Sequence, residues 1–247
     1  MRRFFTKPEN ISSDYVNITE DASHITKVLR MSIGDRIIVF DGTGYEYTAE
    51  LTSIDKNKCI AKIVSKTYSE QEPKVKVVIY QGIPKSDKMD MIIQKAVELG
   101  ATSIVPVSMD RCVTKLDNAK KLSEKVKRWN KIAVEAAKQC GRGILPSVEK
   151  PLKFLQAVDK LKQTELSIMP YEVLGHSGVS SLRNKLKTTN ATDIGVLIGP
   201  EGGFSDAEAE YAKENGINMV GLGKRILRTE TVSSVILSAI LYESGEL

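Results

Sequence analysis

The sequence predicts an α/β protein in two domains, a small β-rich domain followed by a larger domain built on a parallel sheet. The first prediction depends on residues 1–70, where short runs of alternating apolar residues surround glycine-containing turns. The second depends on the chain after Lys74, where strand-like apolar runs alternate with helix-like segments. The polar stretch SEQEPK (69–74) contains a proline and separates the two patterns. We therefore expect domains at 1–70 and 74–247.

Within the first domain, a hairpin is the strongest signal. DRIIVFDGTGYEYTAELTSI (35–54) places two apolar runs on either side of Asp41-Gly42-Thr43-Gly44, which is typical of a turn between antiparallel strands. KCIAKIVSK (58–66) alternates like a further strand, and ASHITKVLR (22–30) predicts a short helix. These elements indicate a small barrel or sandwich.

The second domain begins with the buried-strand run KVKVVIYQGI (74–83). The next segment, SDKMDMIIQKAVELG (86–100), predicts a helix with Ser86 or Asp87 as N-cap and Gly100 as its stop. Its apolar face consists of Met89, Ile92, Ile93, Ala96 and Val97. The pattern then predicts a strand at 103–107, helices at 118–140 and near 151–162, a strand at 165–169, a helix at 177–187, a strand at 194–198, a helix at 206–215, a strand at 217–222 and a last apolar helix at 231–243.

Length and composition fit an ordinary globular protein, with 247 residues of which 41% are hydrophobic and 27% charged. No apolar run approaches the roughly 20 residues that span a bilayer. The start, MRRFFTKPENISS, becomes polar at once, unlike a signal peptide. The three cysteines lack CxxC spacing, which predicts reduced thiols and no zinc site. We therefore expect a cytoplasmic protein without membrane association and without a bound metal.

The net charge of +5 is unevenly distributed along the chain. Residues 1–70 contain ten Lys and Arg and ten Asp and Glu, so the excess lies beyond residue 70. Residues 111–131 contain eight basic residues against Asp117 and Glu124. Such a cluster suits a polyanion, of which nucleic acid is the usual one, although a solvated helix face would have the same composition.

A glycine-rich loop, IGPEGGFSDAE (198–208), joins a predicted strand to a predicted helix. It lacks the Gly-Lys-Ser/Thr of a phosphate loop and the GxGxxG spacing of dinucleotide folds. Ser205 and Glu208 form a capping box that occupies the first free amides of the helix, which disfavours a bound phosphate. The glycines would let main chain approach a neutral or cationic ligand, or would form a tight turn with no ligand.

Two further loops leave strands of the same predicted sheet. GLGKRILRTETVSS (221–234) leads into the last helix, which Thr229 or Thr231 would cap, and IMPYEVLG (168–175) follows an earlier strand. Ligands of open α/β sheets bind beyond the carboxyl ends of the strands, so loops at that edge can line one pocket. The three loops together therefore predict a ligand site.

These motifs resemble a known family. IGPEGGFSDAE followed by LGKRILRTET (222–231) resembles the carboxyl-terminal signature of the SPOUT-class RNA methyltransferases, and within that class the RsmE family of 16S ribosomal RNA uridine N3-methyltransferases. The similarity covers nearly the whole chain, and one departure is MDRC (109–112), where the family usually has Glu-Arg-Ser. The other similar segments are RRFF, HITKVLRMSIGDRIIVFDGTG, KMDMIIQKAVELGATSIVPV and EAAKQCGRGILP.

The resemblance implies a PUA-like RNA-binding β-barrel followed by a SPOUT-type parallel sheet with a carboxyl-terminal trefoil knot. It implies S-adenosylmethionine as methyl donor, a homodimer, and methylation of N3 of one uridine in the 16S ribosomal RNA of the small ribosomal subunit. No metal is implied, because a sulfonium donor is already activated. The residues that it assigns to the cofactor are Pro170, Glu172, Gly199, Pro200, Glu201, Gly202, Gly203, Leu222, Gly223, Ile226, Leu227, Arg228 and Thr231.

Methylation of uridine N3 requires loss of its proton, and the resulting negative charge spreads onto O2 and O4. An arginine near these oxygens would stabilise that charge, and the candidates are Arg111, Arg142 and Arg228. The proton acceptor stays open among His24, His176, a carboxylate and water.

The RNA would be held mainly through its phosphates, which position it without reading the sequence. Because N3 lies on the pairing edge of the base, the uridine must be unpaired or swung out. The residues expected to contact RNA are Arg3, His24, Arg30, Lys115, Arg128 and Gln139.

Other functions compete with this interpretation. A related SPOUT enzyme would methylate another base or a ribose 2′-hydroxyl with the same fold and donor. A non-catalytic RNA-binding assembly factor would have a vestigial pocket, against which the intact glycine and arginine pattern argues. A nucleotide hydrolase is disfavoured, since the sequence lacks both a phosphate loop and a cluster of metal-binding carboxylates.

Overall fold

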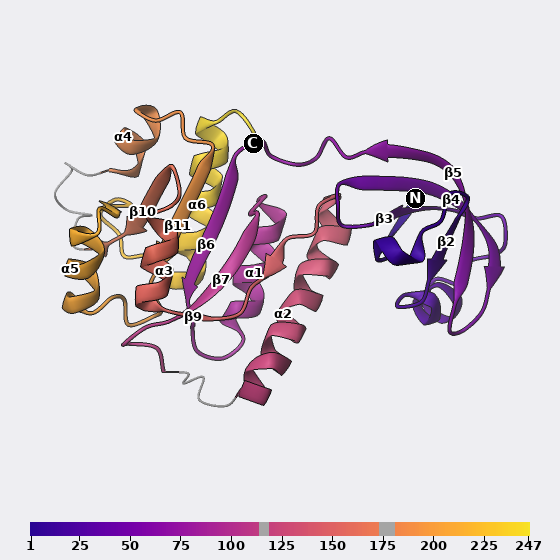
Figure 1. Cartoon of the computed structure of the whole chain (residues 1–247), viewed down its shortest axis with the longest axis horizontal. Coiled ribbons are helices and arrows are strands. Elements are labelled where there is room, and N and C mark those ends of the chain that lie inside the picture. Colours follow the sequence, from indigo (N-terminus) through magenta and orange to yellow (C-terminus); the bar gives the residue numbers. More distant parts are fainter. Residues whose placement is uncertain (114–118, 173–180) are drawn as a thin grey trace. The chain divides into compact units, whose positions relative to one another are not determined.

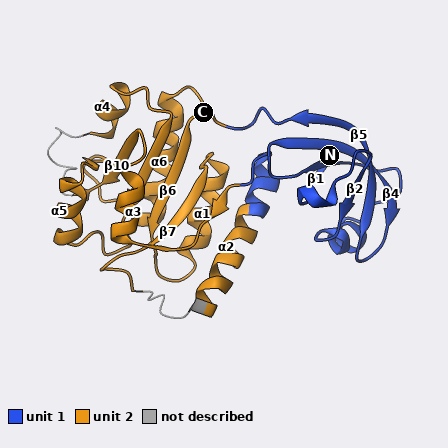
Figure 2. Ribbon diagram, in the orientation of Figure 1, with its two compact units in different colours: residues 1–72, 134–145 blue, residues 73–133, 146–247 orange. Residues whose placement is uncertain are grey.

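Residues 1–113, 119–172 and 181–247 are described by the computed structural model and divide into two units (Figure 2). Unit 1 consists of residues 1–72 together with 134–145, and unit 2 consists of residues 73–133 and 146–247. The boundary after residue 72 lies within the predicted linker. The predicted second domain at 74–247 is corrected by this division, because residues 134–145 belong to unit 1.

Unit 1 contains a five-stranded sheet in the order β1-β3-β4-β5-β2, with β1 and β3 parallel and the other neighbours antiparallel (Figure 1). The predicted hairpin and the strand after it are confirmed as β3, β4 and β5. The predicted short helix is a π-helix, η2. The elements are β1 (Arg2–Phe5), the 3-10 helix η1 (Pro8–Asn10), β2 (Tyr15–Ile18), η2 (His24–Val28), β3 (Arg36–Phe40), β4 (Tyr45–Ile54) and β5 (Cys59–Tyr68).

The core of unit 1 follows from the alternation of its strands. Every second residue is buried, such as Ile37 and Val39 on β3 and Ala49 and Leu51 on β4. The turn between β3 and β4 is closed by the Asp41 carboxylate, which accepts hydrogen bonds from Thr43 and from the Tyr47 hydroxyl. Burial of Tyr47 beside this carboxylate raises the pKa of its hydroxyl to about 12.

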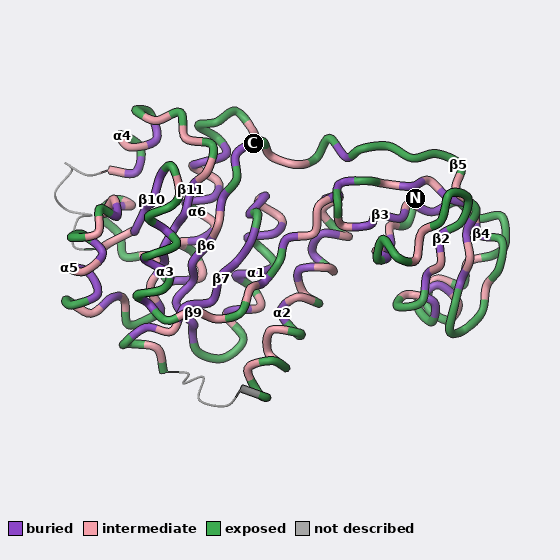
Figure 3. The backbone as a smooth tube through the Cα atoms, in the orientation of Figure 1, coloured by how far each residue is buried: buried purple, intermediate pink, exposed green. Residues whose placement is uncertain are grey.

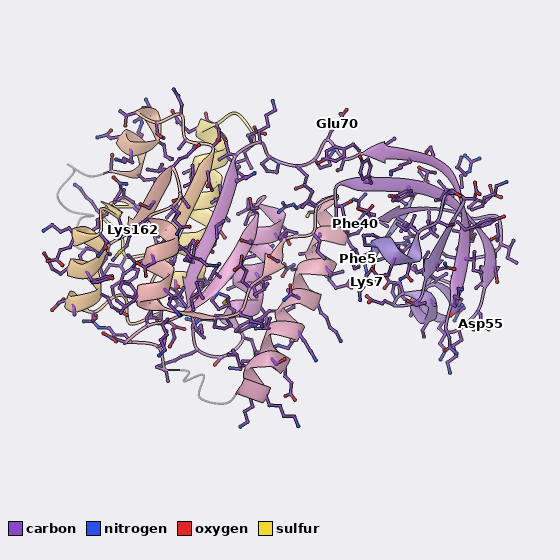
Figure 4. All side chains as sticks on the ribbon, viewed as in Figure 1. Phe5, Lys7, Phe40, Asp55, Glu70 and Lys162 are labelled. Atoms are coloured by element: carbon purple, nitrogen blue, oxygen red, sulfur yellow. The ribbon has the colours of Figure 1, made fainter. Side chains whose placement is uncertain are left out.

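A second apolar contact lies on the opposite side of β3. Figure 4 labels Phe5 and Phe40, whose ring centroids are 5.4 Å apart, and the guanidinium of Arg3 lies 4.7 Å from the Phe40 ring centroid. Arg3 therefore makes a cation–π contact with the buried Phe40 ring.

Glu72 explains why residues 134–145 belong to unit 1. Its carboxylate accepts hydrogen bonds from the Arg142 guanidinium at 2.7 Å and from the main-chain N–H groups of Gly143 and Ile144, both at 2.9 Å. The side chains of Arg142 and Glu72 are only 6% and 11% exposed. A buried charge pair is stable only when its remaining hydrogen-bonding groups also have partners. Here the main-chain N–H groups of Gly143 and Ile144 satisfy the Glu72 carboxylate.

Unit 2 contains a seven-stranded sheet in the order β12-β10-β11-β6-β7-β8, with β9 also pairing with β7, and every pair is parallel. The predicted parallel α/β sheet is therefore confirmed. Its strands are β6 (Lys76–Gly82), β7 (Ser103–Ser108), β8 (Ser147–Val148), β9 (Leu152–Lys153), β10 (Leu166–Pro170), β11 (Asp193–Ile198) and β12 (Asn218–Val220). Its helices are α1 (Lys88–Glu98), α2 (Ala119–Cys140, whose end lies in unit 1), α3 (Phe154–Leu161), α4 (Leu182–Lys187), α5 (Asp206–Glu214) and α6 (Thr229–Glu243).

Helices cover both faces of this sheet, so its strands are buried along most of their length (Figure 3). On one face, Tyr80 and Leu197 pack in a cluster with residues of α3 and α5, such as Val158 and Ala212. On the other, α6 packs against β11 and against α1. The predicted apolar face of α1 is buried in full.

The last helix is confirmed as α6, and it is mainly a core helix. Ile236, Leu237, Ile240 and Leu241 are buried, whereas Tyr242 is exposed. Among the helices that the structure describes, none combines the length and the hydrophobicity of a membrane-spanning segment. All three cysteines are free, and burial raises the thiol pKa values of Cys59 and Cys112.

We expect Glu72→Ala to lower the free energy of unfolding of unit 1 by about 3–5 kcal/mol, because it removes the carboxylate that pairs with a buried guanidinium and accepts two main-chain N–H groups. Urea unfolding followed by hydrogen exchange of the main-chain amides of unit 1 measures this change. Glu70→Ala is the matched control, since Glu70 lies exposed in the same segment (Figure 4). Equal unfolding midpoints for the two variants would contradict the prediction.

Candidate functional site

The loops that follow strands β6, β10, β11 and β12 enclose a cavity of about 380 Å³ in unit 2. This volume lies in the range of small-molecule sites. It opens at the carboxyl ends of the parallel strands, where the three predicted loops were expected to meet. The lining residues are Lys88, Pro170, Tyr171, Glu172, Ile198, Gly199, Pro200, Glu201, Gly203, Phe204, Leu222, Gly223, Lys224, Arg225, Ile226, Leu227, Arg228, Thr229 and Val232.

The structure brings the residues predicted to hold a cofactor to this one cavity, with the exceptions of Gly202 and Thr231. Its lining includes main chain that no side chain covers. A Cβ atom added at Gly223 would meet nothing within 4 Å, and one at Gly203 would meet only a Glu172 oxygen at 3.9 Å. Both glycines have positive φ angles, which other residues rarely adopt.

The glycine loop crosses the end of β6 at very short range. A Cβ atom on Gly82, the last residue of β6, would lie 2.7 Å from the main-chain nitrogen of Pro200. Only a glycine at this position therefore allows Pro200 to lie against the strand end.

Gln81 joins two of the loops through hydrogen bonds in the interior. Its side chain is fully buried, and its Nε2 donates to the Thr229 hydroxyl at 2.9 Å and to the Gly82 carbonyl at 3.0 Å. The Thr229 hydroxyl donates in turn to the Gly199 carbonyl at 2.7 Å. The start of α6 and the glycine loop are thereby fixed to the same strand.

This role of Thr229 corrects a sequence prediction. Thr229 or Thr231 was expected to cap α6, but the N-cap residue is Arg228, which makes no side-chain capping bond. Thr229 is the first helical residue, and its hydroxyl is used for the bond to the glycine loop instead.

A second set of hydrogen bonds fixes the glycine loop to the loop after β7. The predicted capping box is confirmed, since the Ser205 side chain accepts from Glu208 N and Glu208 Oε2 accepts from Ser205 N. The same buried carboxylate also accepts from Asp110 N at 2.9 Å, and the Ser205 hydroxyl donates to Asp110 at 2.8 Å. Arg111 completes the set by donating to the Gly202 carbonyl at 2.9 Å.

Lys88 gives the cavity a charged rim. Its Nζ lies 3.1 Å from Glu201 and 3.3 Å from Glu230, and the hydrogen bond to Glu201 raises the pKa of Lys88. Glu201 also accepts from the main-chain N–H of Lys85. Neither Lys88 nor Gln81 was predicted to belong to the site, although Gln81 lies at the end of β6 and Lys88 begins the helix that follows this strand.

The three predicted catalytic arginines have different surroundings. Arg228 lines the cavity and is exposed. Arg111 is not among the lining residues and contacts the glycine loop at Gly202. Arg142 belongs to unit 1, where its buried guanidinium pairs with Glu72, so its position is explained by the structure of that unit.

The residues predicted to bind RNA also differ in availability. Arg3 is mostly buried and donates to Glu46, which lowers the pKa of that carboxyl. Arg128 pairs with Asp90 at 2.6 Å. Arg128 is nevertheless exposed, as are His24, Arg30 and Gln139, for which no ion pair is recorded among the described residues. Lys115, together with the proton-acceptor candidate His176, lies outside the described residues.

The cavity can therefore hold a small molecule that presents charges of both signs. Acidic groups come from Glu172 and Glu201, and basic groups from Lys224, Arg225 and Arg228. Among the residues that the structure describes, no group of three or more His, Cys, Asp or Glu side chains could hold a metal ion.

Comparison with known proteins identifies the class. Residues 70–241 match the family model of an RNA methyltransferase domain, and residues 19–64 match that of an RNA methyltransferase PUA domain. The chain is thus an RNA methyltransferase with a PUA domain ahead of its catalytic domain. It is 37% identical to the ribosomal RNA small subunit methyltransferase E of Bacillus subtilis, over 99% of this chain and 97% of that protein.

Solved structures agree with this assignment. A ribosomal RNA small subunit methyltransferase E from Neisseria gonorrhoeae, bound to S-adenosylmethionine, is 31% identical with a TM-score of 0.86, covering 98% of this chain and 97% of that one. A putative methyltransferase from Legionella pneumophila, in complex with the same cofactor, is 29% identical with a TM-score of 0.87, covering 97% and 96%. The chain belongs to the ribosomal RNA small subunit methyltransferase E family.

We expect Glu208→Ala to lower the free energy of unfolding of unit 2 by about 2–4 kcal/mol, because the N–H groups of Ser205 and Asp110 lose a charged acceptor. Urea unfolding followed by the fluorescence of the single tryptophan, Trp129, reports on this unit. Glu210→Ala on the same helix is the control, since its side chain is 63% exposed. An effect no larger than that of Glu210→Ala would refute the role of the Glu208 carboxylate.

Proposed function

We propose that this protein transfers a methyl group from S-adenosylmethionine to N3 of a uridine in the 16S ribosomal RNA of the small ribosomal subunit. The observation that carries the proposal is the single cavity into which the structure gathers nearly all residues assigned to the cofactor by family resemblance. The similarity to a relative solved with this cofactor supports the donor.

The residues of the cavity fit S-adenosylmethionine, which carries a sulfonium, an ammonium and a carboxylate. The uncovered main chain at Gly203 and Gly223 leaves room for a flat or close-packed ligand group. Glu172 and Glu201 can face its cationic groups, and Arg225 can face its carboxylate. When bound, the cofactor supplies an activated methyl group, so the protein has to position the acceptor rather than to activate the donor.

Arg228 is the group that we propose to stabilise the acceptor. Deprotonated uridine carries negative charge on O2 and O4, and a fixed cation beside them lowers the energy of that anion. Arg228 combines exposure with a place in the cavity lining. Arg111 would support it indirectly by holding the Gly202 carbonyl. Arg142 is omitted, because its guanidinium is already neutralised by Glu72.

The proposal includes several further features of the family. The loops after β11 and β12 would form a trefoil knot around the cofactor, and the enzyme would work as a cytoplasmic homodimer. Exposed apolar side chains on two helices that pack together, Met91 on α1 and Val235 and Tyr242 on α6, support a dimer surface there. Exposed His24, Arg30 and Gln139 stay candidates for RNA contact.

The direct test combines the purified protein, labelled S-adenosylmethionine and small ribosomal subunits that lack the modification, followed by mass spectrometry of the nucleosides. Label in N3-methyluridine is the expected result. Label in another base or in a ribose would support S-adenosylmethionine as the methyl donor but would show that uridine N3 is not the acceptor atom. Absence of label together with absence of cofactor binding by calorimetry would overturn the proposal.

We expect Arg228→Ala to lower kcat by about 10²-fold or more while the protein stays folded, as expected when a preorganised charge-stabilising group is removed. Initial rates of methyl transfer at saturating substrate measure the loss. Arg183→Ala is the control, because Arg183 is exposed on α4 and does not line the cavity. Wild-type turnover by Arg228→Ala would remove this arginine from the mechanism.

A further inference from the structure

Two tyrosines are exposed side by side on strands β4 and β5 of unit 1. Tyr45 pairs with Tyr68 across the strands, and their exposed fractions are 40% and 57%. The next residues on this face, Tyr47 and Lys66, are also directly paired. We name Tyr45, Lys66 and Tyr68 the tyrosine platform.

The rings of the platform are held in place. They meet edge to face, with centroids 5.4 Å apart and an interplanar angle of 85°. The Lys66 Nζ lies over the Tyr45 ring, 3.9 Å from its centroid. Tyr68 packs against the main chain of Gly44, where an added Cβ atom would lie 2.6 Å from a ring carbon. An aromatic group that is already ordered loses little conformational entropy when a ligand stacks on it.

The core of the sheet does not account for this arrangement. Residues from Val64 to Tyr68 are exposed on both faces of β5, so the rings of Tyr45 and Tyr68 are not there to fill the interior. Lys66 makes no ion pair within the described residues, and its charge is available to an anion. An exposed aromatic ring beside a cation that makes no ion pair is a combination with which proteins bind single-stranded nucleic acid, by base stacking and phosphate contact.

One cation of unit 1 that was predicted to contact RNA, Arg3, is not available for that contact. Arg3 is engaged with Glu46 and with the Arg142 carbonyl. Lys66 is therefore a better source of positive charge toward RNA than Arg3.

We propose that the tyrosine platform binds single-stranded RNA, with an unpaired base stacked on Tyr68 and the neighbouring phosphate held by Lys66. The site belongs to unit 1, whereas the cavity for methyl transfer belongs to unit 2. The inference rests on the proposed function only in taking ribosomal RNA as the natural ligand. The kind of ligand that the platform binds is inferred from its aromatic and basic side chains alone.

The test compares Tyr68→Ala and Tyr68→Phe in the full-length protein. Its probe is a fluorescent single-stranded oligouridylate of about twelve nucleotides, titrated at low salt and read by anisotropy. Stacking predicts that Tyr68→Ala weakens binding about ten-fold and that Tyr68→Phe, which keeps the ring, binds like the wild type. Equal binding by Tyr68→Ala, or equal losses for both variants, would overturn the proposal.

Two further variants control for fold and charge. Tyr15→Ala removes an exposed tyrosine of unit 1 from β2, where its strand neighbour Val16 points into the core, and it should bind like the wild type. Lys66→Gln should weaken binding and reduce the slope of log affinity against log salt by about one. An unchanged salt slope would overturn the phosphate contact.

A second measurement separates this inference from the proposed function. In the methyl-transfer assay, Tyr68→Ala should raise KM for the ribosomal subunit while kcat and the calorimetric affinity for S-adenosylmethionine stay unchanged. Oligouridylate binding that depends on the Tyr68 ring, in a wild-type protein that transfers no methyl group, would leave the platform standing and refute the proposed function. Normal methyl transfer with an unchanged KM in Tyr68→Ala would refute the platform alone.

Discussion

The buried amide of Gln81 is the constraint on which the candidate site depends. Loops at the edge of a parallel sheet lie outside its ladder of main-chain hydrogen bonds, so side-chain hydrogen bonds can decide how they are placed relative to one another. Gln81 supplies such a bond by donating to Thr229, which donates to Gly199. Because these two hydrogen bonds are excluded from water, breaking them would leave polar groups in the interior without hydrogen-bond partners. The shape of the cavity is therefore coupled to the integrity of the sheet beneath it.

Each unit uses one buried glutamate to fasten a segment that is distant in sequence. Glu72 binds residues 142–144 in unit 1, and Glu208 binds the loop at Asp110 in unit 2. Each carboxylate accepts hydrogen bonds from two main-chain N–H groups. It therefore takes the place of the main-chain carbonyl groups that a neighbouring strand would have provided. A carboxylate does this well because its two oxygens accept several donors at once.

Most of the fold was predictable from periodicity and from the residues at helix ends. The hairpin at Asp41, the apolar face of α1, the capping box at Ser205 and the parallel sheet are local patterns, and the structure has all of them. The three loops were also recognised, because a strand–loop–helix order places them at one edge. What escaped prediction depends on contacts between distant residues. Local residue spacing does not indicate that residues 134–145 belong to unit 1. Nor does it indicate that Arg3 and Arg142 form ion pairs with glutamates.

The division of the chain into units has a consequence for how such proteins can be rearranged. Unit 1 is discontinuous, and it receives its second segment from the end of helix α2, which begins in unit 2. A fragment that stopped at residue 72 would lack the partners of its own buried Glu72 carboxylate. Unit 1 therefore cannot be exchanged between relatives by a single crossover in the gene. Recombination would have to carry both segments together, which ties the inheritance of unit 1 to that of unit 2.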